Sequence, residues 1–129
     1  MSNESFNGSE VQRAAMESFA EAAEAAVVDV AQRVPEGMGP IEQALAAQIR
    51  AAAQQLRGCA DQLARDPLMV TGSTGQRRAH PLLKVAQDLR REITTAIKDL
   101  TFRAEQRGIY ERLKGAHAAR RAELAKDAE

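Results

Sequence analysis

Hydrophobic and polar positions alternate with a helical period along most of the chain. From 10 to about 33, apolar residues recur at roughly helical spacing, and the predicted core face comprises Val11, Ala15, Phe19, Ala22, Ala26 and Val30. Ser9 is predicted to cap this helix. The segment RVPEGMGP follows, in which two prolines and two glycines fall within eight residues and end the helix.

Two further apolar seams have the strict four-three spacing of a coiled coil. The first begins after Pro40, a suitable first helical residue, and ends at Asp66-Pro67. It comprises Leu45, Ile49, Ala52, Leu56, Cys59 and Leu63. The second begins after His80-Pro81 and comprises Leu82, Ala86, Leu89, Ile93, Ala96 and Leu100.

The two seams match as an antiparallel pair, because facing residues such as Leu63 with Leu82 and Leu45 with Leu100 have numbers with the same sum, 145. The axis of this hairpin falls between Gly72 and Ser73, a pair typical of a tight β-turn. The register therefore predicts a short β-ribbon of 68–71 with 74–77, or a loop, at the hairpin tip. Leu83, Val85 and Ile97 widen the second apolar face, which implies a further neighbour: the N-terminal helix, another subunit, or both.

The expected fold is all-α: a long antiparallel, coiled-coil-like hairpin over 40–107, an N-terminal helix over 10–33 and a helical C-terminal extension. Residues 1–9 are expected to be a disordered tail, 10–114 a single helical domain, and 115–129 a polar basic tail that frays or is ordered by a partner. Alanine is abundant and aromatic residues make up only 3% of the chain, so a monomer would bury little apolar area and self-association is expected.

The formal net charge of zero conceals a division into two halves. Residues 1–66 have a balance of −5 and residues 67–129 a balance of +5. This division permits head-to-tail contact between subunits, or contact of the basic half with nucleic acid. The acidic N-terminal helix would be repelled by phosphate, so DNA contact is expected in the basic half.

The candidate DNA-binding residues all lie in that basic half. Lys84, Arg91 and Lys98 are seven apart and form one stripe, which is also what a solvated helix face would present. Arg77 and Arg78 would lie at the hairpin tip. The remaining candidates are Arg103, Arg107, Arg112, Lys114, Arg120 and Arg121.

Catalytic and metal-binding patterns are weak by comparison. Cys59 lies on an apolar seam, neither histidine has metal-ligand spacing to it, and the glycines near Gly72 lack a phosphate-loop pattern. The sequence therefore predicts a non-enzymatic protein without metal or cofactor. One cysteine, no signal peptide and no membrane-length apolar run predict a soluble cytoplasmic protein.

The run VTGSTGQRRAHPLLK, within residues 40–100, resembles the small terminase subunit of tailed bacteriophages, in the family with a helix, a basic glycine-containing loop, a His-Pro and a second helix. The matching loop positions are Gly72, Gly75, Arg77, Arg78, His80, Pro81 and Lys84. His80 is expected to bond backbone at the helix start, or to serve as a pH switch or phosphate contact.

The resemblance implies a ring-forming homo-oligomer that recognises double-stranded viral DNA and presents it to the large terminase subunit, which holds the ATPase and nuclease. In it, the seam of Leu45, Ile49, Leu56, Leu63, Leu82, Leu89, Ile93 and Leu100 would serve as core or oligomerisation surface. The segment after Leu100 departs from the family pattern, so the second helix is expected to run on there. The alternative function is a coiled-coil adaptor that binds protein partners only.

Overall fold

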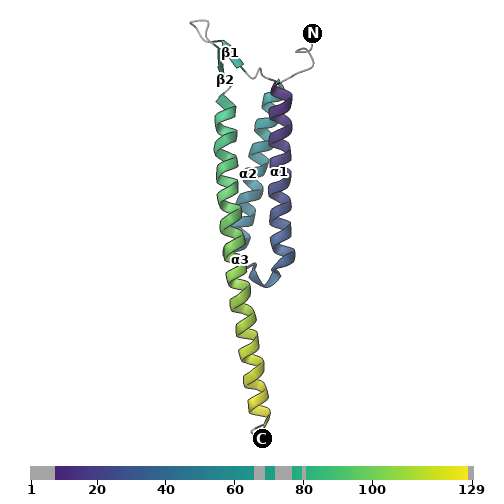
Figure 1. Cartoon of the computed structure of the whole chain (residues 1–129), viewed down its shortest axis with the longest axis vertical. Helices are drawn as coiled ribbons and strands as arrows, with labels where there is room; N and C mark the ends of the chain where they lie inside the picture. Colours follow the sequence, from purple (N-terminus) through teal and green to yellow (C-terminus); the bar gives the residue numbers. More distant parts are fainter. Residues whose placement is uncertain (1–7, 66–68, 72–76, 80, 128–129) are drawn as a thin grey trace.

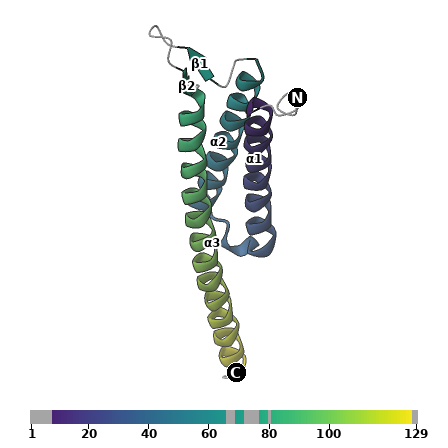
Figure 2. The same cartoon turned by 45° about the horizontal axis from the view of Figure 1, so that its top comes forward.

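The computed structural model describes residues 8–65, 69–71, 77–79 and 81–127. In order, these form α1 (Gly8–Arg33), the short 3-10 helix η2 (Pro35–Gly37), α2 (Pro40–Arg65), β1 (Met69–Thr71), β2 (Arg77–Ala79) and α3 (Pro81–Asp127). The three α-helices run side by side and alternate in direction, and α3 projects far beyond the other two (Figures 1 and 2). The predicted all-α class is confirmed.

The core-facing side of α1 differs from the prediction. Its buried residues are spaced alternately by four and three, and they are Met16, Ala20, Ala23, Val27, Val30 and Val34 just beyond the helix. Of the predicted face, Val11 is half exposed, whereas Val30 is buried. The prediction was wrong by a rotation of roughly 100°, one residue around the helix. Helix α1 also begins at Gly8, so Ser9 lies within it and is not its cap.

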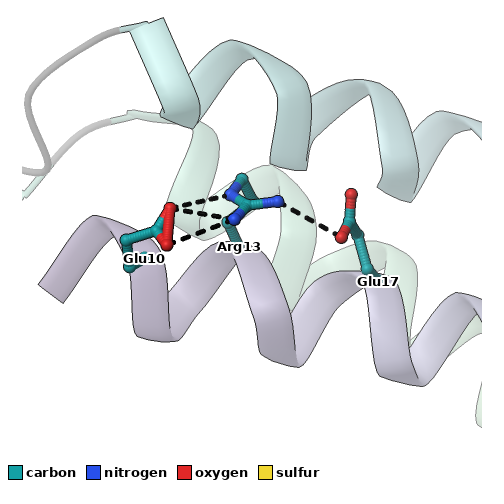
Figure 3. Close-up of polar contacts among 3 residues, drawn as sticks. All are labelled: Glu10, Arg13 and Glu17. Atoms are coloured by element: carbon teal, nitrogen blue, oxygen red, sulfur yellow. Dashed lines mark hydrogen bonds and ion pairs between the residues drawn. The ribbon is translucent and has the colours of Figure 1, made fainter. Parts of the chain in front are cut away.

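Arg13 of α1 makes local ion pairs along its own helix. Arg13 lies between Glu10 and Glu17, three residues before it and four after it, and its guanidinium contacts both carboxylates (Figure 3). The N–O distances are 2.8 Å to Glu10 Oε1 and 3.3 Å to Glu17 Oε2. The hydrogen bond to Glu10, together with the negative charges of Glu10 and Glu17, raises the pKa of Arg13. Two acidic side chains of α1 are thus paired within the helix.

The elbow, residues 34–39, reverses the chain between α1 and α2. Within it, Gly37 N–H donates to Val34 O at 3.0 Å and Met38 N–H to Pro35 O at 3.2 Å. Gly37 is buried against the backbone of α3, where an added Cβ would overlap the carbonyl oxygen of Ala104. The glycine therefore permits a close approach between elbow and α3.

Helix α2 lies between two neighbours and buries a correspondingly wide face. It begins at Pro40 and ends at Arg65, immediately before Asp66-Pro67, as predicted. Its buried residues include the predicted Ile49, Leu56 and Leu63. Ala46, Ala53 and Ala60 are also buried, each one residue after a predicted seam position. A bidentate ion pair joins Arg57 to Glu24 of α1, with both N–O distances 2.7 Å. The small side chains of these three alanines allow α2 to pack closely against its neighbours.

Strands β1 and β2 form a two-stranded antiparallel sheet beyond the end of α2. The pairs are Met69 with Ala79, Val70 with Arg78 and Thr71 with Arg77. Residue numbers therefore sum to 148 rather than to the predicted 145, and the paired segments are 69–71 with 77–79. The predicted Gly72-Ser73 turn lies outside the described residues.

Helix α3 is continuous over 47 residues. It begins at Pro81, as predicted, and passes the elbow without a break before continuing to Asp127. The segment 115–127, predicted to be a fraying tail, is part of this helix, and residues 112–127 are all exposed. The part of α3 after Gly108, residues 109–127, is named the arm.

The core of the bundle contains the predicted seams. Ile49, Leu56, Leu63, Leu89, Ile93 and Leu100 are buried, and Leu45 and Leu82 are half-buried against them. These residues pack within one chain, so any oligomerisation requires another surface. Leu83 and Ile97 also pack on the core, and α1 supplies a neighbour for that side of α3. None of the described helices combines the length and hydropathy needed to cross a membrane.

Candidate nucleic-acid interface

Three of the predicted cations lie on the outward face of α3, opposite its buried residues. We name Lys84, Arg91 and Lys98 the cationic stripe; at 100° per residue they fall within an arc of about 40°. Their side chains are exposed, to 76% for Lys84 and 71% for Arg91. Asp88 lies 3.6 Å from Lys84 Nζ and 3.9 Å from Arg91 Nη1. Such exposed pairs are weak, so a phosphate can compete with Asp88 for both cations.

The groove between α2 and α3 is less suited to phosphate. It has a volume of about 860 Å³ and lies beside the cationic stripe. Its lining consists of Leu45, Gln48, Asp88, Arg91, Glu92, Thr95, Ala96 and Asp99. Three carboxylates against one guanidinium give this groove a negative balance, which favours DNA contact on the outward face of α3 and not within the groove.

Three other predicted cations, Arg103, Arg107 and Arg112, form ion pairs with carboxylates of their own chain. Arg103 Nε lies 3.0 Å from Asp99 Oδ1, one turn earlier in α3. Arg112 Nε lies 3.4 Å from Glu36 Oε1 in the elbow and also donates to the Gly108 carbonyl. Arg112 therefore helps to hold α3 against the elbow.

Arg107 makes the most buried of these contacts. Its Nε donates to Glu42 Oε1 at 2.8 Å, and Glu42 is only 3% exposed. The same oxygen accepts the Gly39 N–H at 3.1 Å, so Glu42 occupies the third position of α2 and reaches back to the residue that caps it. Arg107, a predicted DNA contact, thus joins α3 to the start of α2.

The charge of Glu42 is stabilised by these partners. Burial alone would raise the pKa of its carboxyl, but the backbone N–H groups and the Arg107 guanidinium outweigh burial and lower the pKa below its ordinary value. Glu42 is consequently ionised at neutral pH. The buried side-chain nitrogen and oxygen atoms of the described residues all have hydrogen-bond partners.

Lys114, Arg120 and Arg121 lie on the arm. All three are exposed, and no ion pair among the described residues involves them or Lys98. Arg77 and Arg78 lie in β2, at the opposite end of the molecule from the arm. The loop positions Gly72, Gly75 and His80 are outside the described residues, whereas Pro81 opens α3. The cations predicted as one group therefore fall into separate regions.

The described part of the chain contains no group of three or more His, Cys, Asp or Glu residues arranged to hold a metal ion. Cys59 is buried in the core, and burial raises the pKa of its thiol. A buried neutral thiol is a poor nucleophile.

The sequence interpretation missed the contacts of the elbow. Arg33 Nη1 of α1 lies 3.1 Å from Glu105 Oε2 of α3, beside the Glu42–Arg107 and Glu36–Arg112 pairs. Gly108 is buried where Val34 packs, and an added Cβ would lie 2.6 Å from Val34 Cγ1. The one local sequence signal for the role of Glu42 was its position three residues after Gly39, which is the spacing of a capping box.

Comparison of the chain with protein-family models, curated proteins and solved structures finds no match. The function is therefore argued from the residues and their arrangement.

Proposed function

We propose that this chain is a non-enzymatic, DNA-binding subunit of a homo-oligomer, of the small terminase kind. In this role it binds double-stranded viral DNA during genome packaging and acts with the large terminase subunit. The proposal joins the resemblance of the loop between α2 and α3 to the charge of α3. The observation that carries it is the cationic stripe, three exposed cations at seven-residue spacing on one outward helix face.

The chemistry of the stripe suits backbone contact and not base reading. Each Lys or Arg that neutralises a phosphate releases condensed counterions, and this gain does not depend on sequence. The described stripe contains no aromatic side chain on which an unpaired base could stack. Lys98 has no carboxylate partner among the described residues, so it is fully available to a phosphate.

A salt series with a fluorescent DNA duplex tests the proposal. The logarithm of the binding constant should fall linearly with the logarithm of salt concentration, with a slope of about −0.9 per phosphate neutralised. Replacing Arg91 and Lys98 together by Gln should weaken binding and reduce the slope by roughly two.

The matched control removes two positive charges elsewhere. Arg50 and Arg65 are exposed on α2 and have no ion pair among the described residues, so Arg50→Gln with Arg65→Gln changes net charge equally. The control should keep nearly the full salt slope. Equal slopes for the two double variants would show that the cationic stripe is not the DNA contact. A chain that binds no duplex even at low salt would contradict the proposed function itself.

A protein-only adaptor is the second candidate. It is favoured by exposed apolar residues on the lower part of α3, which DNA backbone would not cover. Retention of oligomers without any duplex affinity would support it.

A further inference from the structure

The exposed arm has one side that carries cations but no carboxylates. We name it the basic face, and at 100° per residue its members fall within an arc of about 100°. They are Tyr110, Leu113, Lys114, His117, Arg121 and Leu124. The first five of these side chains line one shallow hollow of about 340 Å³. The carboxylates of the arm, Glu111, Glu123 and Asp127, all lie outside this arc.

The basic face is also partly apolar and is not covered by its own chain. Tyr110, Leu113 and Leu124 are 63%, 57% and 56% exposed. The arm extends past the end of the bundle, and no other described helix lies beside it (Figures 1 and 2). A phosphate backbone would pair with the cations but leave these three apolar side chains in water. An acidic helix with an apolar surface would satisfy both kinds of side chain.

Only one of the three described α-helices is acidic. Helix α1 has five carboxylates against two guanidinium groups, whereas α2 has two carboxylates against three guanidinium groups. Helix α3 has seven carboxylates against eleven Lys and Arg residues. The charge of the basic face therefore selects α1 as its complement.

The outward side of α1, formed by its exposed residues, has both an apolar and an acidic character. Half of its twelve members are Val or Ala, and these are Val11, Ala14, Ala15, Ala22, Ala25 and Val28. The small alanine side chains leave room for larger side chains of a partner helix. The charged members are Glu10, Glu21, Asp29 and Arg33. Arg33 is already shared by Asp29 and by Glu105 of α3, so a negative surplus remains.

We infer that the basic face of the arm packs against the outward side of α1 in a second copy of this chain. The 19 residues of the arm measure about 28 Å and the 26 residues of α1 about 39 Å, so the arm fits along α1. Leu113 and Leu124 then lose exposed area against Val and Ala, while Lys114 and Arg121 lie near surplus carboxylates.

This contact joins two different surfaces. Each copy offers an arm to one neighbour and α1 to another, so the association is head-to-tail and either closes into a ring or grows as a chain of subunits. The contact rests on the proposed function only for the expectation of a homo-oligomer, to which it assigns two surfaces. Its tests use no DNA, so its failure is distinguishable from failure of DNA binding.

The first test measures the mass of the full chain by sedimentation equilibrium at micromolar to submillimolar concentration. The native chain should be an oligomer. Lys114→Glu with Arg121→Glu should reduce it to the 14.0 kDa monomer, and so should Glu10→Lys with Glu21→Lys, because each pair of changes places like charges together. All four changes in one chain restore opposite charges and should restore the oligomer.

The matched control is Arg91→Glu with Lys98→Glu. These residues are exposed on the same helix and have the same seven-residue spacing as Lys114 and Arg121, but they lie outside the arm. The control should keep the native mass. A native monomer, an unchanged mass for either two-residue variant, or equal dissociation of the control would each overturn the inference.

Helical circular dichroism shows whether each variant folds. If the charge reversal in the arm costs helix, the milder Lys114→Gln with Arg121→Gln replaces it, and unchanged association of that variant overturns the inference. A folded four-residue variant that stays monomeric, although both two-residue variants fold and dissociate, also overturns it, because opposite charges would then not be what pairs the surfaces.

Carbodiimide cross-linking, which joins amines to carboxylates, identifies the neighbours of Lys114 directly. Isotope-labelled and unlabelled native chains are refolded together from urea, so that a cross-linked peptide pair with one label marks a contact between chains. Lys114 should be joined to Glu10 or Glu21 of the other chain. An oligomer in which Lys114 forms no such link to α1 would overturn the inference.

Discussion

Arg107 and Glu42, 65 residues apart in the chain, form an ion pair in which Arg107 Nε donates to Glu42 Oε1 at 2.8 Å. Glu42 is almost fully buried, while the Arg107 side chain retains about a third of its exposure. The pair connects α3 to the N-terminal end of α2 and also satisfies the Gly39 N–H at the start of that helix. It therefore links the packing of α3 to the capping of α2.

Arg107→Ala should destabilise the chain by roughly 2 kcal/mol, because it leaves a buried carboxylate without its charged partner. Urea unfolding at neutral pH measures this change. The comparison is Arg103→Ala, whose exposed pair with Asp99 should contribute at most about 0.5 kcal/mol. Similar losses from both variants would contradict the role assigned to Arg107.

The Glu42 carboxylate should make stability fall in acid. Its folded-state pKa is lowered, so its contribution is fully present above the unfolded pKa and is lost as pH falls through the folded value. Glu42→Gln removes this dependence. The stability difference between the native chain and this variant should be constant from pH 6 to 8 and shrink below about pH 4. Urea unfolding across this range measures it, and a pH-independent difference would be the contrary result.

Two glycines should respond in opposite ways to alanine. Gly37→Ala places a methyl group against the Ala104 carbonyl, where overpacking should cost about 1–3 kcal/mol. Gly58 lies within α2 with open space around its Cβ position, so Gly58→Ala should stabilise by about 0.5–1 kcal/mol. Thermal unfolding of both variants measures the contrast. A stabilising Gly37→Ala would show that the elbow does not approach α3 closely.

Glu24 and Arg57 should be energetically coupled across α1 and α2. Their contact is bidentate, and both side chains are about 30% exposed. A double-mutant cycle with alanine should give a coupling of about 0.5–1 kcal/mol that decreases with salt. Glu21 and Arg50, exposed on the same two helices without a direct ion pair in the described structure, serve as the reference cycle and should show almost none.

Both ends of α2, the start of α3 and the apolar seams of these two helices followed from the sequence. Pro40, Pro81 and the Asp66-Pro67 pair mark ends by removing backbone donors or restricting the preceding residue, effects that need no knowledge of the fold. Leu and Ile at four-three spacing stand out clearly from their polar neighbours, so the core side of these helices was recognisable.

The face of α1 was harder to predict because alanine occurs on several of its sides. Ala15 and Ala22 are exposed whereas Ala20 and Ala23 are buried, and only Met16 and Val27 distinguish the two rows. The strand register could not be derived from the apolar seams, because three residues separate α2 from β1 whereas one separates β2 from α3. Arg107 was assigned to DNA because its partner, Glu42, lies far away in sequence.

The continuity of α3 also fixes a length. At 1.5 Å per residue, its 47 residues make a rod of about 70 Å between Pro81 and Asp127, close to two turns of B-form DNA at about 34–36 Å each. Because no break interrupts α3, its two ends are held at this distance from each other. Any partner that touches both β2 and the far end of the arm must itself span that distance.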